Sequence, residues 1–184
     1  MKRRVALALF LALFLSGCGG PAAVETRPPP TLPASALPGL HSRTRSLDAV
    51  SLAADGLGAL ETVLQDAGFV AGSEREFFGR TQTFNHVVAR VLVFEDPGGA
   101  SRLLAWLRSH PDVILGRSVE GKPLPLGESP MLFALGSCGC HAEVPTFFAA
   151  WHRGATVLWL VAAGPGANRA TVGSLARNFD RDVS

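Results

Sequence analysis

Two thiols and an imidazole stand close together in the run Cys138-Gly139-Cys140-His141 of this 184-residue chain. Cysteine and histidine side chains are donors that zinc and copper(I) prefer, so the run could hold a metal ion. A fourth ligand would come from a distant histidine, and three are candidates: His86, His110 and His152. Zinc sites usually separate paired cysteines by about two to four residues, whereas Gly139 alone separates these, so the spacing argues against a metal.

The same two thiols could instead form a disulfide with each other. Cα atoms two residues apart in a turn can approach the separation of roughly 4.4–6.8 Å that a disulfide needs. A ring closed across Gly139 alone would be strained, and strained disulfides are readily reduced, which leaves a thiol-redox role open. The spacing differs from the Cys-x-x-Cys of thioredoxin-like proteins. In an oxidising compartment we expect Cys138 and Cys140 to form a local disulfide that closes the loop.

The rest of the sequence contains no motif that points to a particular reaction. It has no Gly-x-Ser-x-Gly turn, phosphate-binding loop or zinc-protease helix motif, and no two acids can be named as a glycosidase pair. The segment from Gly164 to Asn168 could present N–H groups to an anion, but a tight turn is the simpler interpretation. Four aromatic residues could line a ligand pocket, although core packing is the default for such residues: Phe147, Phe148, Trp151 and Trp159. We therefore favour a protein that is not an enzyme.

The chain begins with a segment typical of protein export. Three basic residues at positions 2–4 precede an uninterrupted apolar run over residues 5–15. This run is about half as long as a membrane-spanning helix needs to be. Small residues then lead to a cysteine in Leu15-Ser16-Gly17-Cys18, which resembles the lipobox of bacterial lipoproteins. The resemblance implies a signal peptide over residues 1–17, cleavage before Cys18, and a diacylglyceryl group and an N-acyl group on that cysteine.

The lipid implied by this resemblance determines the expected location. One acyl chain binds a membrane reversibly, whereas two or three hold firmly, at about 0.8 kcal/mol per buried methylene. We therefore expect an extracytoplasmic protein of the bacterial cell envelope, anchored to a membrane through Cys18. The choice between the cell membrane and the outer membrane stays open. No cofactor besides this covalent lipid is predicted.

Removal of the export segment changes the charge balance. The whole chain has 17 basic and 15 acidic side chains, and loss of the basic residues at positions 2–4 leaves 14 against 15. Such a balance provides no basic patch for nucleic acid and no polybasic run for a second membrane contact. The expected partner besides the membrane is an unidentified envelope protein or a small apolar ligand.

A segment rich in proline and alanine follows the modified cysteine. Six prolines fall between residues 19 and 46, with few apolar side chains to bury. We predict that residues 18–46 form an extended, mobile tether. Residues 47–184 then form one globular domain of ordinary size.

Hydrophobic periodicity predicts an α+β domain. Helices are expected over residues 47–67, from Pro97 to a point before Pro111, and after Asn168, with Asp96 and Asn168 as N-caps. Strands are expected over residues 73–81, 85–94, 131–135, 146–152 and 155–163. The expected fold is a mostly antiparallel sheet of about five strands covered by three helices, in the order α-β-β-α-β-β-β-α.

The last two strands are expected to form a hairpin with the two-residue turn Arg153-Gly154. In that register, two pairs of residues lie opposite each other: Phe148 with Trp159, and Trp151 with Thr156. A register of this kind places large apolar groups on both faces of the hairpin.

The order of elements is similar to that of small extracytoplasmic lipoproteins with PsbP-like or LpqN-like α/β domains. In those proteins a strand ending in Phe is followed by a short turn, a Gly-Ala pair and an amphipathic helix. The matching residues here are Val91 to Phe94, Gly99-Ala100 and the hairpin from Trp151 to Trp159. The resemblance implies a non-catalytic envelope protein with a role in binding or assembly. The alternative is a small redox or metal-binding lipoprotein that uses Cys138, Cys140 and His141.

Overall fold

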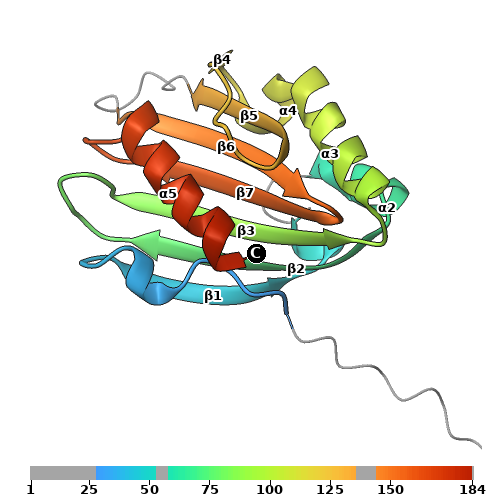
Figure 1. Cartoon of the computed structure of the whole chain (residues 1–184), viewed down its shortest axis with the longest axis horizontal. Coiled ribbons are helices and arrows are strands. Elements are labelled where there is room, and N and C mark those ends of the chain that lie inside the picture. Colours follow the sequence, from blue (N-terminus) through green and yellow to red (C-terminus); the bar gives the residue numbers. More distant parts are fainter. Residues whose placement is uncertain (1–27, 53–57, 136–143, 184) are drawn as a thin grey trace, which may run out of the picture.

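One antiparallel sheet of seven strands organises the described part of the chain, which in this computed structural model comprises residues 28–52, 58–135 and 144–183 (Figure 1). The strand order is β1-β2-β3-β7-β6-β5-β4. The strands are β1 (His41–Leu47), β2 (Phe69–Phe78), β3 (His86–Phe94), β4 (Ser118–Glu120), β5 (Glu128–Leu135), β6 (Thr146–Arg153) and β7 (Thr156–Ala163). The helices are the 3₁₀ turn η1 (Ala34–Ala36), α1 (Ala49–Leu52), α2 (Gly58–Asp66), α3 (Pro97–Ser109), α4 (Pro111–Leu115) and α5 (Arg169–Val183).

Each face of the sheet carries a hydrophobic core. Along β3, Val87, Ala89 and Val91 belong to the core that includes α5. Leu92 and Phe94 belong to the core that includes α2 and α3. This alternation is expected of a strand that is buried on both sides. Figure 1 shows α5 crossing one face of the sheet, with α3 at the other side.

The predicted fold class is confirmed, whereas the predicted numbers of elements are wrong. The domain is α+β with an antiparallel sheet, but the described residues form seven strands and five α-helices instead of about five and three. The periodicity missed β1 and β4. All residues of β1 except Leu47 are exposed, so no alternation of apolar side chains marks this strand. Strand β4 has only three residues, too few for a pattern.

Charge pairing holds β1 against β2. Arg43 lies opposite Glu76, and Arg45 lies opposite Glu74. Their ion pairs measure 2.5 Å and 2.8 Å between nitrogen and oxygen. Cross-strand pairs of opposite charge stabilise a sheet, but each pair here joins residues about thirty positions apart in the sequence. A reading of local periodicity therefore could not find the strand.

Residues 28–46 pack on the domain, so the prediction of a mobile tether is wrong for this part of the chain. Leu32 is fully buried in the core on the α5 side. The Ser73 hydroxyl donates a 2.6 Å hydrogen bond to the carbonyl oxygen of Pro29, and Thr31 donates one of 3.3 Å to that of Ala89. A segment rich in proline has few conformations to lose, so a small number of buried contacts suffices to order it. Residues 18–27 of the tether lie outside the described residues.

Helices α3 and α5 begin where their capping residues predict. The Asp96 carboxylate accepts a 2.9 Å hydrogen bond from the N–H of Gly99. The side-chain oxygen of Asn168 accepts hydrogen bonds from the N–H groups of Ala170 and Thr171. The apolar stripe of α5 is buried throughout: Val172, Leu175, Ala176 and Phe179.

The helix predicted over residues 47–67 is replaced by two helices, α1 and α2, and residues 53–57 lie outside the described residues. Strand β2 begins at Phe69, four residues before the predicted start. Gly68 has a φ of 73°, a conformation that ends a helix and that glycine adopts without strain. The chain can therefore pass directly from α2 into the strand.

The hairpin of β6 and β7 is confirmed, but its register differs by two residues from the expected one. The observed pairs are Arg153 with Thr156, Trp151 with Leu158, and Phe148 with Val161. The turn is therefore Gly154-Ala155, and Gly154 has a φ of 52°, which favours glycine at this position. Because the shift is even, every side chain keeps its predicted face. Phe148 still meets Trp159 edge to face, with ring centroids 4.9 Å apart.

Candidate functional site

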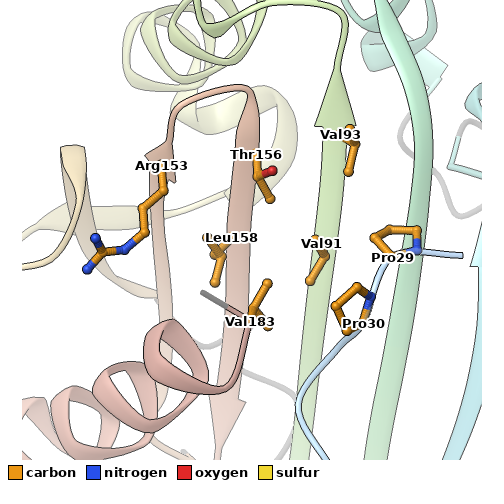
Figure 2. Close-up of a pocket in the computed structure, with 8 residues that line it drawn as sticks. All are labelled: Pro29, Pro30, Val91, Val93, Arg153, Thr156, Leu158 and Val183. Carbon is orange, nitrogen blue, oxygen red and sulfur yellow. The ribbon is translucent and has the colours of Figure 1, made fainter.

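A pocket of about 400 Å³ opens on the α5 side of the sheet (Figure 2). Its floor consists of two neighbouring cross-strand pairs from β3 and β7: Val91 with Leu158, and Val93 with Thr156. Its walls come from three other segments: Pro29 and Pro30 before η1, Arg153 at the end of β6, and Val183 at the end of α5. A pocket of this size falls within the range of roughly 300–1,000 Å³ that is typical of small-molecule sites.

The surface inside this pocket is mostly apolar. Among the described residues that line it, Thr156 and Arg153 are the polar ones. Figure 2 shows Val91, Leu158 and Val183 arranged around the opening, whereas the guanidinium of Arg153 points away from them. Arg153 therefore contributes mainly the carbon stem of its side chain to the wall.

Asp180 holds the α5 wall in place. This carboxylate is 7% exposed and accepts hydrogen bonds from the indole N–H of Trp151 at 2.8 Å and from Nε and Nη2 of Arg153 at 2.7 Å and 2.5 Å. The hydrogen bond from Arg153 is the main cause that lowers the pKa of Asp180, and burial opposes it. Trp151 also packs edge to face on Phe179, with ring centroids 5.9 Å apart. The last turn of α5, which ends at Val183, is thus fixed to the hairpin.

The opposite wall is held with similar firmness. The carbonyl oxygen of Pro29 accepts the hydrogen bond from Ser73, a residue that is 1% exposed. Leu32, three residues further along, is fully buried. Because proline fixes its own φ, Pro29 and Pro30 keep a defined shape between these contacts. Both walls therefore exist before any ligand arrives, which lowers the entropy cost of binding.

A second hollow, of about 470 Å³, lies over β1, β2 and β3 and is lined mostly by charged side chains. At its buried end, Glu74 accepts hydrogen bonds from Nε of Arg45 at 2.8 Å and from Nε of Arg90 at 2.6 Å. The guanidinium carbon of Arg90 lies 5.6 Å from the ring centre of Trp159, within the range of a cation–π contact. We call this hollow the charged groove.

Glu76 occupies the outer end of the charged groove. Its carboxylate lies 2.7 Å from Nε2 of His86 and 2.5 Å from Nε of Arg43. Burial raises the pKa of Glu76, but hydrogen bonds from His86 and Arg43 outweigh it, so the pKa lies below its ordinary value. Each carboxylate of the charged groove is therefore paired within the protein, and we interpret the groove as a structural ion-pair network.

Ser101 of α3 and His152 of β6 form a hydrogen-bonded pair, with 3.2 Å between the hydroxyl oxygen and Nε2. Nδ1 lies 3.1 Å from the carbonyl oxygen of Gly154, which assigns the proton to Nδ1 and leaves Nε2 to accept from the serine. Serine hydrolases use this arrangement, but neither residue lines the apolar pocket or the charged groove. His152 is 2% exposed, and a buried histidine needs a partner at both nitrogens. We interpret the pair as a structural link between α3 and the hairpin.

Cys18, Cys138, Cys140 and His141 lie outside the described residues, so the lipid, disulfide, redox and metal assignments stay predictions. Among the residues that the structure describes, no three or more His, Cys, Asp or Glu side chains gather as a metal site. The histidines considered as a fourth ligand have other neighbours: Glu76 at His86, Trp106 at His110, and Ser101 at His152.

The aromatic residues of the hairpin serve mainly as core. None of the four considered as pocket-lining residues lines the apolar pocket. Three of them are buried, namely Phe148, Trp151 and Trp159, and Phe147 is partly buried. Packing, the default interpretation of these residues, is therefore confirmed.

The segment from Gly164 to Asn168 forms the tight turn that the simpler interpretation predicted. The N–H of Gly166 donates a 3.1 Å hydrogen bond to the carbonyl oxygen of Thr83, and the N–H of Ala167 donates one of 3.1 Å to that of Gly164. A Cβ on Gly164 would overlap the backbone of Thr83 and Phe84, so the close approach requires glycine. These N–H groups are thus already used within the protein.

Sequence reasoning did not find the apolar pocket. The pocket joins the proline-rich segment, two central strands and the end of α5, and no local pattern relates these segments to one another. One signal was present: Asp180 lies four residues after Ala176, beside the buried stripe of α5. A carboxylate in that position requires a partner from another element, and the structure shows that the partners are Trp151 and Arg153.

No protein-family model and no curated protein matches the chain. Among solved structures, the chain is similar to the extracellular domain of PknH from Mycobacterium tuberculosis, with 14% sequence identity and a TM-score of 0.44. That match covers 78% of this chain and 82% of the other. Within the described ranges, no helix has the length and apolar character needed to span a membrane.

Proposed function

We propose that the protein is a lipid-anchored, extracytoplasmic protein of the bacterial cell envelope that binds a small apolar molecule without transforming it. The apolar pocket between the N-terminal segment and α5 carries the binding part of this proposal. The lipobox-like run that ends at Cys18 supports the anchor.

The lining of the pocket supports binding in preference to catalysis. Of the eight lining residues within the described part of the chain, only Arg153 is titratable, and Asp180 pairs with its charge. General acid–base and nucleophilic catalysis both require a reactive side chain within hydrogen-bond reach of the substrate. A pocket lined in this way can hold an apolar group and exclude water from it, which is what reversible binding requires.

The position of the pocket fits an anchored protein. The N-terminal wall, at Pro29, comes eleven residues after Cys18 in the sequence. A fully extended chain of that length spans at most roughly 36–40 Å. A lipid on Cys18 would therefore keep the mouth of the pocket within that distance of the membrane surface.

The anchor is tested by the Cys18→Ser variant. Cell fractionation should find the wild-type protein with the membranes and the variant in the soluble extracytoplasmic fraction, because the thioether-linked chains are absent. Retention of the variant on the membranes would contradict the lipid anchor.

Binding is tested with N-phenyl-1-naphthylamine, an uncharged dye whose fluorescence rises in apolar surroundings. The mature chain carrying Cys18→Ser should bind one dye molecule with a saturable signal. Val183→Asp, at the α5 wall, should lower the affinity for the dye at least tenfold. Val50→Asp, at a residue of α1 that is 68% exposed, should leave that affinity unchanged. Thermal unfolding confirms that both variants are folded, and a non-saturable signal in the parent protein would refute the binding role.

A further inference from the structure

We propose that the apolar pocket takes up one hydrocarbon chain of a single-chain amphiphile drawn from the membrane, with the polar head group left in water at the mouth. A lysophospholipid has this chemistry. The inference rests on the proposed function, because it names the ligand of the same site.

The shape of the pocket favours a single linear chain. Its floor is one pair of strands wide, and neighbouring strands lie about 4.8 Å apart. A hydrocarbon chain laid along this floor contacts Val91 and Leu158 at about 4 Å between carbons. The two prolines and Val183 would then flank it from opposite sides.

The charges around the pocket require that the buried part of the ligand be neutral. The guanidinium of Arg153 points away from the floor and binds Asp180 through two hydrogen bonds. Among the described residues that line the pocket, Arg153 is the charged one. A charged head group would find no partner on the floor and would lose its hydration, so it must stay outside.

The location of the pocket indicates where such a chain comes from. The lipid expected on Cys18 lies eleven residues before Pro29, which forms the N-terminal wall of the pocket. The membrane that receives the anchor is therefore the nearest source of hydrocarbon chains. Because anchoring confines the pocket to the membrane surface, the pocket meets membrane amphiphiles at a far higher effective concentration than any dissolved molecule.

The experiment uses the mature chain with Cys18→Ser, so that no attached acyl chain competes for the pocket. A series of lysophosphatidylcholines, from octanoyl to palmitoyl, is titrated by calorimetry below the micelle concentration of each. We expect one binding site and an affinity that rises about fourfold for each added methylene until the chain exceeds the pocket, after which it levels off. An affinity that does not depend on chain length would overturn the proposal.

A variant whose pocket is filled by a larger side chain provides a second test of the proposal. Val93→Phe places a ring on the floor, and Val119→Phe is the matched control at a residue of β4 that is 71% exposed and does not line the pocket. The floor variant should bind the palmitoyl probe at least tenfold more weakly, and the control should bind as the parent does. If thermal unfolding shows that Val93→Phe is not folded, Val183→Phe blocks the same space from the α5 wall. Equal binding by the floor variant and the control would overturn the proposal.

Two outcomes separate this inference from the proposed function. If the dye binds in the pocket and no lysophospholipid does, the hydrocarbon ligand is wrong and the binding role stands. If neither binds, both are wrong. The lipidated wild-type protein in detergent should also accept the added lysophospholipid. If it refuses the probe and the Cys18→Ser protein accepts it, the protein's own acyl chain is the occupant, and the proposal of a separate amphiphile is overturned.

Discussion

Replacement of Asp180 by alanine should lower the free energy of unfolding by about 1–4 kcal/mol, although the residue is charged and lies near the end of the chain. The change leaves the indole N–H of Trp151 buried without an acceptor, which costs about 1–3 kcal/mol. Loss of the ion pair with Arg153 adds only about 0–1 kcal/mol, because half of the Arg153 side chain is exposed and water can solvate its charge. The sum is a large share of the roughly 5–15 kcal/mol that stabilises a typical domain.

A graded series separates these two contributions. Asp180→Asn keeps an oxygen that can accept from Trp151 and should cost about 1 kcal/mol, and Arg153→Ala should cost about 0–1 kcal/mol. Urea denaturation at neutral pH gives all three values, with equal m-values as the check that the unfolding reaction is the same. Equal destabilisation by Arg153→Ala and Asp180→Ala would refute this prediction. The unpaired indole N–H of Trp151 would then not be the main cause of the lost stability.

The same interaction predicts a pH dependence. Hydrogen bonds from Arg153 and Trp151 place the folded-state pKa of Asp180 below its unfolded value, which is about 3.9. The stabilisation is therefore complete above that pH and is lost as the pH falls through the folded-state value. The difference in stability between the wild type and Asp180→Asn should shrink below about pH 4. A difference that grows in acid would contradict the assignment.

The Asp180 variants also connect stability with binding. Because Asp180 fixes the last turn of α5, its replacement by alanine loosens the wall that Val183 forms. Ligand affinity should fall at temperatures where the protein is still folded, since part of the binding energy must then order the wall. Asp180→Asn should reduce affinity less than Asp180→Ala does.

Two further changes test contacts on the opposite face of the sheet. Ser101→Ala should lower the free energy of unfolding by about 1–3 kcal/mol, because Nε2 of the buried His152 loses its partner. A serine-directed acylating reagent should leave Ser101 unmodified, and rapid modification would contradict a purely structural role. Gly99→Ala should lower the melting temperature and Gly58→Ala should not, because a Cβ on Gly99 would overlap the carbonyl oxygen of Ala67, whereas none of the described residues comes within 4 Å of a Cβ on Gly58. Equal melting temperatures for the two variants would contradict the close contact between Gly99 and the backbone of Ala67.

Elements with local signals were predictable. Asp96 and Asn168 mark the starts of α3 and α5 because a cap bonds to N–H groups two or three residues away. The same holds for β3, whose apolar residues on both faces mark it as a central strand. The register of the hairpin was not predictable in this way. A shift of two residues keeps every side chain on its face, so the hydrophobic pattern suits both registers, and the turn at Gly154 decides between them.

The class of the fold, the caps of its two longest helices and the faces of its central strands follow from the amino-acid sequence, which also supplies the prediction of a lipid on Cys18. The folded structure was needed to show that the proline-rich segment is a wall, that β1 joins the sheet, and that Pro29 and Val183 flank one pocket. This difference arises from the range of the interactions. Capping and alternation act over a few residues, whereas the bonds of Ser73 with Pro29 and of Asp180 with Trp151 join positions 44 and 29 residues apart, which come together only when the sheet packs.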